Sequence, residues 1–106
     1  MKPIRYIALS SVIILLSQGV LLSHPQEGTI VGYVYDAVTG VGLPGVNLIL
    51  EGTTKGASTD PDGAFKISHI QPGTYTLTAS MIGYKDKNYR VEVTGEKIVR
   101  MDFYLE

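Results

Sequence analysis

The segment STDPDGAF is the part of the sequence in which residue types and spacing come closest to a binding site. Ser58, Asp60 and Asp62 stand at alternate positions, like the oxygen ligands in the front half of a calcium-binding loop, and Gly63 follows directly. If Ser58 were the first of twelve loop positions, the twelfth should be a bidentate Glu, yet it is His69. Helices flank such a loop, whereas the residues around this segment alternate as strands do. The spacing therefore predicts no metal site.

The same segment fits a tight turn better. Pro61 has the backbone angle that suits the second position of a type I turn, and Asp62 suits the third. Gly63 accepts the positive φ that follows in a bulged hairpin. We therefore predict that Asp60, Asp62 and Gly63 have a structural role in a turn.

Catalytic side chains are scarce in the rest of the sequence. His24 and His69 are the only histidines, and therefore the only candidates for a general base near neutral pH. His69 shortly precedes a Pro–Gly turn and has no nucleophile or carboxylate in a recognisable relation to it. Two histidines without cysteine fall short of a zinc site, and no glycine-rich phosphate loop or carboxylate pair appears. The sequence predicts no enzyme, no catalytic residue and no cofactor.

Tyr33 and Tyr35 are the residues that suggest ligand binding. They share one face of a predicted strand with Val31 beside them, and together could form an aromatic platform for a sugar ring. The alternative is packing, because a tyrosine ring often covers a sheet face or edge while its hydroxyl stays in water. From sequence, Tyr33 and Tyr35 are thus either ligand-binding residues or packed ones.

The first 23 residues read as a signal peptide. Lys2 and Arg5 form a basic front, and a mostly apolar run from Ile7 to Leu22 follows. A membrane anchor would need roughly 18 to 20 apolar residues, but this run is shorter and is interrupted by serines and a glutamine. We therefore expect a signal peptide at residues 1–23, which occupies the membrane only transiently.

The remaining composition indicates one folded domain. Hydrophobic residues make up 44% of the chain and charged residues 18%, which favours a globule over a disordered segment. Beyond the leader, seven Lys and Arg stand against ten Asp and Glu, a net charge of −3 with interspersed signs, so nucleic acid is not an expected partner. The chain has no cysteine and hence no disulfide. We expect a linker at residues 24–28 and a domain at residues 29–106.

A hydrophobic period of two runs through the expected domain. In the segment TYTLTASM, Tyr75, Leu77 and Ala79 alternate with threonines, as in a strand with one buried and one wet face. Turn signals rich in Gly, Pro and Asp separate such segments. Further strands are expected at residues 29–36, 46–52, 55–59, 64–68, 88–93 and 97–106. The pattern predicts an all-β fold, a seven-stranded antiparallel β-sandwich with Greek-key connections.

Several short motifs occur in an order that resembles the carboxypeptidase regulatory-like domain, a prealbumin-like β-sandwich module of exported proteins. The resemblance extends from about Thr29 to Leu105. The motifs that carry it are Gly32-Tyr33-Val34 with Asp36, Thr39-Gly40, Leu43-Pro44-Gly45-Val46, Gly52-Thr53-Thr54, Thr59-Asp60 with Gly63 and Phe65, Pro72-Gly73-Thr74-Tyr75, and Ile82-Gly83-Tyr84.

The resemblance implies a non-catalytic module. Such domains accompany peptidases, stand at the N-terminus of TonB-dependent outer-membrane receptors, or occur nearly alone in envelope proteins. A receptor would continue with a plug and a long barrel, whereas this chain ends at Glu106, so a free-standing module and the front of a truncated product both remain open. The expected location is the periplasm or the outer membrane.

The resemblance also orders the functional hypotheses. The first is a structural or interaction module of the cell envelope, whose partner is an envelope protein or the remainder of a receptor. A carbohydrate-binding module that uses an aromatic sheet face is the alternative, with a glycan as its partner. A third is the appended domain of a peptidase or receptor.

Overall fold

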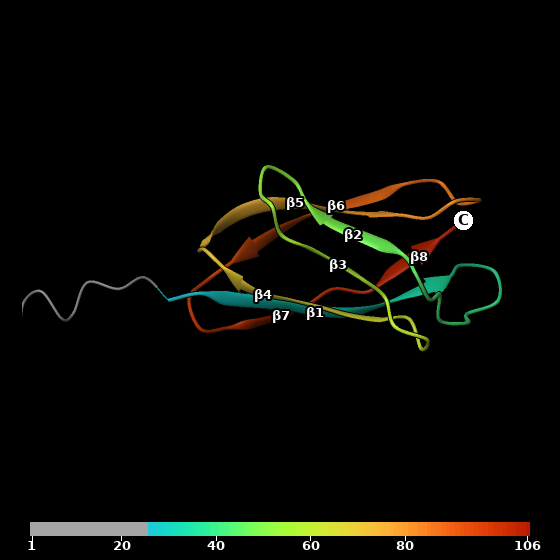
Figure 1. The fold of residues 1–106 in the computed structure, drawn as a ribbon, viewed down its shortest axis with the longest axis horizontal. Helices are drawn as coiled ribbons and strands as arrows, with labels where there is room; N and C mark the ends of the chain where they lie inside the picture. Colours follow the sequence, from blue (N-terminus) through green and yellow to red (C-terminus); the bar gives the residue numbers. More distant parts are fainter. Residues whose placement is uncertain (1–25) are drawn as a thin grey trace, which may run out of the picture.

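The computed structural model describes residues 26–106, which form two β-sheets packed face to face (Figure 1). The predicted signal peptide at residues 1–23, His24 and the start of the predicted linker lie outside the described residues. Within the described part of the chain, no helix is long and apolar enough to span a membrane. The predicted all-β sandwich is confirmed.

Eight strands make up the two sheets. In chain order they are β1 (Gly28–Asp36), β2 (Asn47–Leu50), β3 (Gly56–Ser58), β4 (Ala64–Ile70), β5 (Gly73–Ser80), β6 (Lys87–Val93), β7 (Ile98–Arg100) and β8 (Phe103–Leu105). The first sheet has the order β4-β1-β7, with β8 also paired to β1, and the second has the order β3-β2-β5-β6. Strand β1 is therefore the central strand of its sheet.

The core lies between the sheets and follows the predicted alternation. On β6, Val91 and Val93 are buried while Arg90 and Glu92 are exposed, as a strand with one dry face requires. The buried hydrophobic residues are Ile30, Val34, Val46, Leu48, Leu50, Phe65, Ile67, Ile70, Leu77, Ala79, Val91, Val93, Phe103 and Leu105. Both sheets contribute to this single cluster, which holds the layers together without disulfides.

The C-terminal region differs from the prediction in two respects. The single strand expected at residues 97–106 is two strands, β7 and β8, which raises the count from seven to eight, and both run parallel to β1. Thr29 pairs with Ile98 and Val34 with Phe103, so the register is the same on both sides of the break. Alternation cannot predict strand direction, because the period of two is the same in parallel and antiparallel pairs.

The break between β7 and β8 has a local cause. Met101 donates its backbone N–H to Val31 O at 2.9 Å, and the Tyr33 N–H donates to Asp102 Oδ1 at 3.0 Å in place of a backbone carbonyl. The Met101 carbonyl comes so close to Gly32 that a Cβ there would overlap it. Glycine at position 32 and a short carboxylate at position 102 thus let the edge strand kink without losing its register.

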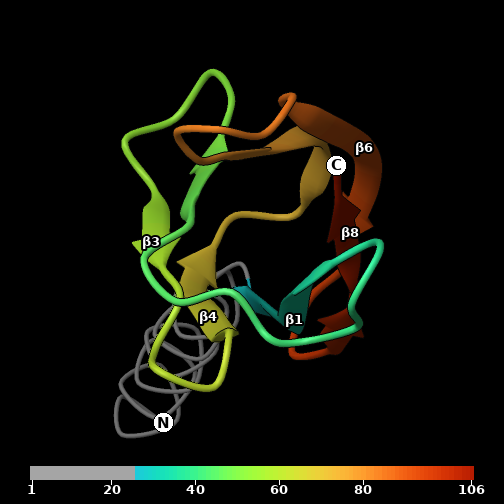
Figure 2. The same cartoon turned by 90° about the vertical axis from the view of Figure 1, so that its right-hand side faces the viewer.

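One side of the sandwich is closed where the chain passes from β3 to β4. Viewed end-on, β3 and β4 lie on one side and β6 and β8 on the other (Figure 2). Thr59, between β3 and β4, is buried; its hydroxyl donates to Leu43 O and accepts from the Val46 N–H. These bonds fix the point at which the chain crosses from the second sheet to the first.

Candidate functional site: an aromatic column on the outer sheet face

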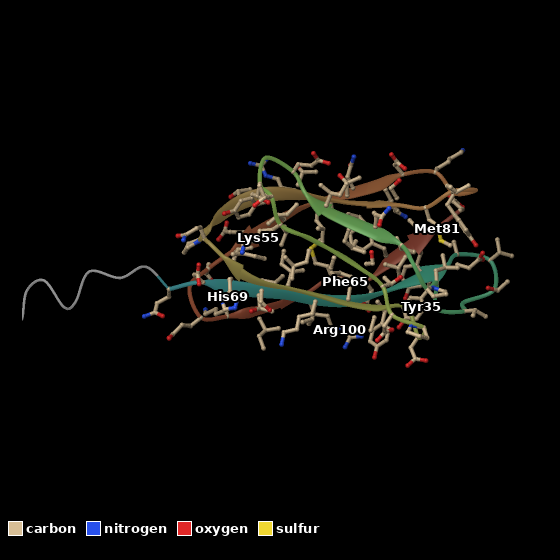
Figure 3. All side chains as sticks on the ribbon, viewed as in Figure 1. Tyr35, Lys55, Phe65, His69, Met81 and Arg100 are labelled. Carbon is tan, nitrogen blue, oxygen red and sulfur yellow. The ribbon has the colours of Figure 1, made fainter. Side chains whose placement is uncertain are left out.

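An aromatic column lies on the face of the first sheet that points away from the core. We define it as Tyr33, Tyr35, Tyr104 and Arg100. Tyr33 and Tyr35 are alternate residues of β1, and Tyr104 of β8 is the register partner of Tyr35. Arg100 of β7 is opposite Val31. Figure 3 shows Tyr35 and Arg100 pointing away from the second sheet, with Phe65 between the sheets.

The column is held together by stacking. The rings of Tyr33 and Tyr35 are 5.8 Å apart between centroids with planes 11° apart, and those of Tyr35 and Tyr104 are 5.2 Å apart with planes 29° apart. The Arg100 guanidinium lies 5.6 Å from the centroid of the Tyr33 ring, within cation–π range. Both faces of the Tyr35 ring are therefore engaged within the column, and the Tyr33 ring lies between Tyr35 and Arg100, while Tyr104 keeps exposed surface for contact with another molecule.

The charges beside the column are balanced. Arg100 Nη2 lies 3.4 Å from Asp102 Oδ2, and the other oxygen of the same carboxylate accepts the Tyr33 N–H. Burial raises the pKa of Tyr35 above its ordinary value, and the negative charge of Asp102 raises it further. Tyr35 is thus a neutral phenol at neutral pH, and the column offers hydrogen-bonding hydroxyls beside one cation.

Sequence reasoning found half of this column. Tyr33 and Tyr35 are both in it, and each is partly buried. Tyr104 and Arg100 were not among the predicted site residues. Their positions in the alternating segment at residues 97–106 did indicate an outward side chain, but only the parallel pairing of β7 and β8 with β1 brings them beside the two tyrosines.

The residues predicted to form a turn lie at the connection between β3 and β4, next to the part of β1 that carries the column: Val34, between Tyr33 and Tyr35, donates its N–H to Gly63 O at 2.8 Å. Gly63 donates its N–H to Asp60 O at 2.9 Å, and Asp60 Oδ1 accepts the backbone N–H groups of Asp62 and Ala64, both at 2.9 Å. Gly63 has φ of 87°. Asp60 Oδ1 is thus engaged by the backbone of the turn.

Two other polar features of residues 26–106 lie apart from the column. His69 is exposed, with Nδ1 3.3 Å from Glu27 Oε1, and no group of three or more His, Cys, Asp or Glu that could hold a metal occurs among residues 26–106. A shallow depression of about 470 Å³ lies on the second sheet. It is lined by Glu51, Gly52, Thr74, Tyr75, Thr76 and Arg90 and includes no residue of the column.

Comparison with known proteins identifies the relatives of this chain. The CarboxypepD_reg-like domain model matches residues 30–106. The chain is 34% identical to the TonB-dependent receptor P39 of Formosa agariphila over 79 residues, which is 74% of this chain and 7% of the receptor. It is 34% identical to the TonB-dependent receptor SusC of Bacteroides thetaiotaomicron over 94 residues, 86% of this chain and 9% of the receptor. The chain therefore spans less than a tenth of the length of these relatives.

A solved structure supports the same fold. The type II cohesin–X-dockerin complex of Acetivibrio cellulolyticus contains a chain that superposes with a TM-score of 0.60 at 25% sequence identity. The match covers 74% of this chain and 56% of that one. The fold is thus shared with a chain of that complex.

Proposed function

The chain belongs to the family of CarboxypepD_reg-like domains, and we propose that it is a non-catalytic interaction module of the cell envelope, located in the periplasm or at the outer membrane. The likeness to two TonB-dependent receptors supports the remainder of such a receptor as its partner. A peptidase-appended module is a less favoured member of the same class. In each case the module contributes a surface and no chemistry.

The observation that carries this proposal is the aromatic column. Tyrosine and arginine are both enriched at the energetic centres of protein–protein interfaces: tyrosine supplies a large, rigid contact area at small entropic cost, and arginine supplies a planar group with several hydrogen-bond donors. Here four such side chains adjoin on a flat sheet face, and stacking fixes them before any partner arrives. Tyr104 is 48% exposed. A preorganised surface of this kind suits docking onto a protein.

Geometry disfavours the carbohydrate-binding alternative for Tyr33 and Tyr35. A sugar ring stacks on the face of an aromatic ring, yet the Tyr35 ring already stacks with two neighbours and the Tyr33 ring lies beside Tyr35 and Arg100. Binding a pyranose there would first require the rings to separate. We expect a glycan array probed with the purified chain to give no signal above background, and specific binding lost in Tyr35→Ala would favour the sugar instead.

Site-specific photo-cross-linking tests the docking proposal. A photoreactive phenylalanine analogue replaces Tyr104 in cells that make the chain with its leader, and cross-linked products are identified by mass spectrometry. We expect a TonB-dependent receptor among them. Ile49, which is 45% exposed on the outer face of the second sheet, is the matched control position. Equal cross-linking from positions 104 and 49, or none to a receptor from position 104, would contradict the proposal.

A further inference from the structure

Strand β6 leaves one edge of the second sheet without a partner. Its seven residues pair antiparallel with β5 from Lys87 to Val93 in unbroken register, and no other strand of residues 26–106 pairs with it. Figure 2 shows β6 at the outer side of the sandwich. Unpaired edges are sites at which another strand can add to a sheet.

The hydrogen-bond pattern between β2, β5 and β6 identifies which backbone groups of β6 point toward the open edge of the sheet. Glu51 donates its N–H to Thr76 O at 2.9 Å, so Thr76 and every second residue of β5 bond toward β2, and the residues between them bond toward β6. Tyr75 and Leu77 therefore bond to their partners Val91 and Tyr89. It follows that the N–H and C=O groups of the remaining β6 residues, Asn88, Arg90 and Glu92, face the open edge.

These groups have no other partner in the described chain. None of the backbone bonds outside the strands, and none of the side-chain bonds among residues 26–106, involves a backbone group of Asn88, Arg90 or Glu92. The side chains of all three are exposed, as the alternation on β6 requires. The edge therefore presents regularly spaced donors and acceptors, flanked by one cation and one anion on the same face.

The other edges of the two sheets are less suited to pairing. Strands β3, β7 and β8 have three residues each. Strand β4 has seven residues, but its register with β1 shifts between Gly28 and Ile30, and His69 within it has φ of 59°. Short strands and bulges are the usual means of blocking an edge. Among the described edges, β6 alone is both long and regular.

We propose that β6 pairs antiparallel with β6 of a second copy of this chain, with Arg90 opposite the partner's Glu92. The two-fold axis then passes beside Val91, so the ion pair forms twice, once on each side of the axis. Moving the register by two residues in either direction places Arg90 opposite the partner's Arg90, or Glu92 opposite the partner's Glu92. Charge complementarity thus selects one register.

The inward side chains of β6 follow from the same register. Val91 lies next to the partner's Val91, and Tyr89 lies opposite the partner's Val93. Tyr89 is partly buried and packs on Phe103 at 5.0 Å between ring centroids. Val91 and Val93 are already buried within one copy, at 4% and 1% exposed, so pairing gains its free energy from the edge backbone bonds and the ion pairs. The proposed pairing uses an edge of the second sheet, whereas the aromatic column lies on a face of the first sheet. The pairing therefore does not depend on the proposed function.

Charge reversal tests this pairing. The full chain, made with its leader and purified, is examined by sedimentation velocity over a concentration series. We expect a reversible dimer, and Arg90→Glu or Glu92→Arg should each raise its dissociation constant by about tenfold or more, because each places like charges opposite one another twice. The double variant Arg90→Glu/Glu92→Arg restores the ion pairs and should dimerise as the wild type does.

Lys66→Glu is the matched control, since Lys66 is an exposed charge on β4. It should leave the dimer unchanged, and thermal unfolding confirms that every variant folds. A wild-type chain that stays monomeric throughout the series overturns the proposal, as does a dimer that both single reversals leave intact. Cross-linking from position 104 reports on the face of the first sheet, and dimerisation reports on the edge at β6. Either proposal can therefore fail without the other.

Discussion

Gly63 is constrained by both its backbone angle and its surroundings. Its φ of 87° lies in a region that side chains with a Cβ disfavour. A Cβ built there would lie 2.7 Å from Val34 O and 2.9 Å from Leu43 N. The glycine therefore lets the turn after Asp60 lie against the backbone of the first sheet, which explains these residues without a metal.

We predict that Gly63→Val lowers the free energy of unfolding by more than Gly40→Val does. Gly40 also has positive φ, at 74°, but no atom lies within 4 Å of a Cβ built on it. The control should therefore show the conformational cost alone, about 1 kcal/mol, and Gly63→Val that cost plus the steric overlap. Urea unfolding measures both, and equal losses would contradict the packing argument.

The same preparation tests the turn against the metal. Asp60 Oδ1 already accepts two backbone N–H groups. We therefore predict that the wild-type chain has the same melting temperature in the presence of calcium as in the presence of a chelator. A melting temperature that rises with calcium would restore a metal role for Asp60 and Asp62.

At the scale of elements, the carboxylate of Asp102 takes the place of one backbone acceptor between β1 and the strands β7 and β8. The Tyr33 N–H would otherwise face the kink between β7 and β8 with no acceptor. A buried or half-buried N–H without a partner costs free energy. The kinked edge depends on this side chain as much as on the space at Gly32.

We predict that Asp102→Ala costs about 1–3 kcal/mol of stability, because it leaves the Tyr33 N–H without its acceptor. Amide hydrogen exchange at Tyr33 should become faster, while exchange at Val34, which donates to Gly63 O, changes only with global stability. Asp102→Asn keeps a carbonyl oxygen and should stay close to the wild type. An unchanged exchange rate at Tyr33 in Asp102→Ala would show that another group accepts this hydrogen bond.

The strands were predictable because their cause is local. Alternation placed Phe65 and Ile67 inside and Lys66 outside, as found. Pairing was not predictable, since direction and neighbour depend on residues far along the chain. That is why the predicted single strand at residues 97–106 proved to be two parallel strands, and why Tyr104 was not grouped with Tyr33 and Tyr35.

At the scale of the whole molecule, a hydrogen bond between two side chains helps to join the two sheets at the end that holds Glu106, where Lys85 also donates its N–H to Glu106 O. Tyr84, in the connection from β5 to β6, donates its hydroxyl to Asp36 Oδ2 at 2.7 Å, and Asp36 ends β1. Asp36 Oδ1 accepts the N–H groups of Val38 and Thr39. The Thr39 N–H first, then the Tyr84 hydroxyl and the Val38 N–H, lower the pKa of Asp36 below its ordinary value.

This direction of shift predicts a loss of stability in acid. A carboxylate whose pKa is lower in the folded state stabilises the fold at pH above its unfolded pKa, and that contribution disappears as pH falls through the folded pKa. The free energy of unfolding of Asp36→Asn should therefore fall less between neutral and acidic pH than that of the wild type. Tyr84→Phe should lie between them, because the two backbone donors remain. Equal slopes for wild type and Asp36→Asn in urea unfolding at a series of pH values would refute the assignment.

The parallel partners of β1 have a consequence for the order in which the chain can fold. Thr29 pairs with Ile98 and Val34 pairs with Phe103. One side of β1 can therefore form its hydrogen bonds only with residues that lie 69 positions further along the chain. Closing so long a loop before any of its contacts form costs entropy and slows folding. A polypeptide is made from its N-terminus, so β1 leaves the ribosome before all of its partners, and β7 and β8 are the last of them to follow. The central strand of the first sheet is thus the first to be synthesised and among the last to be completed.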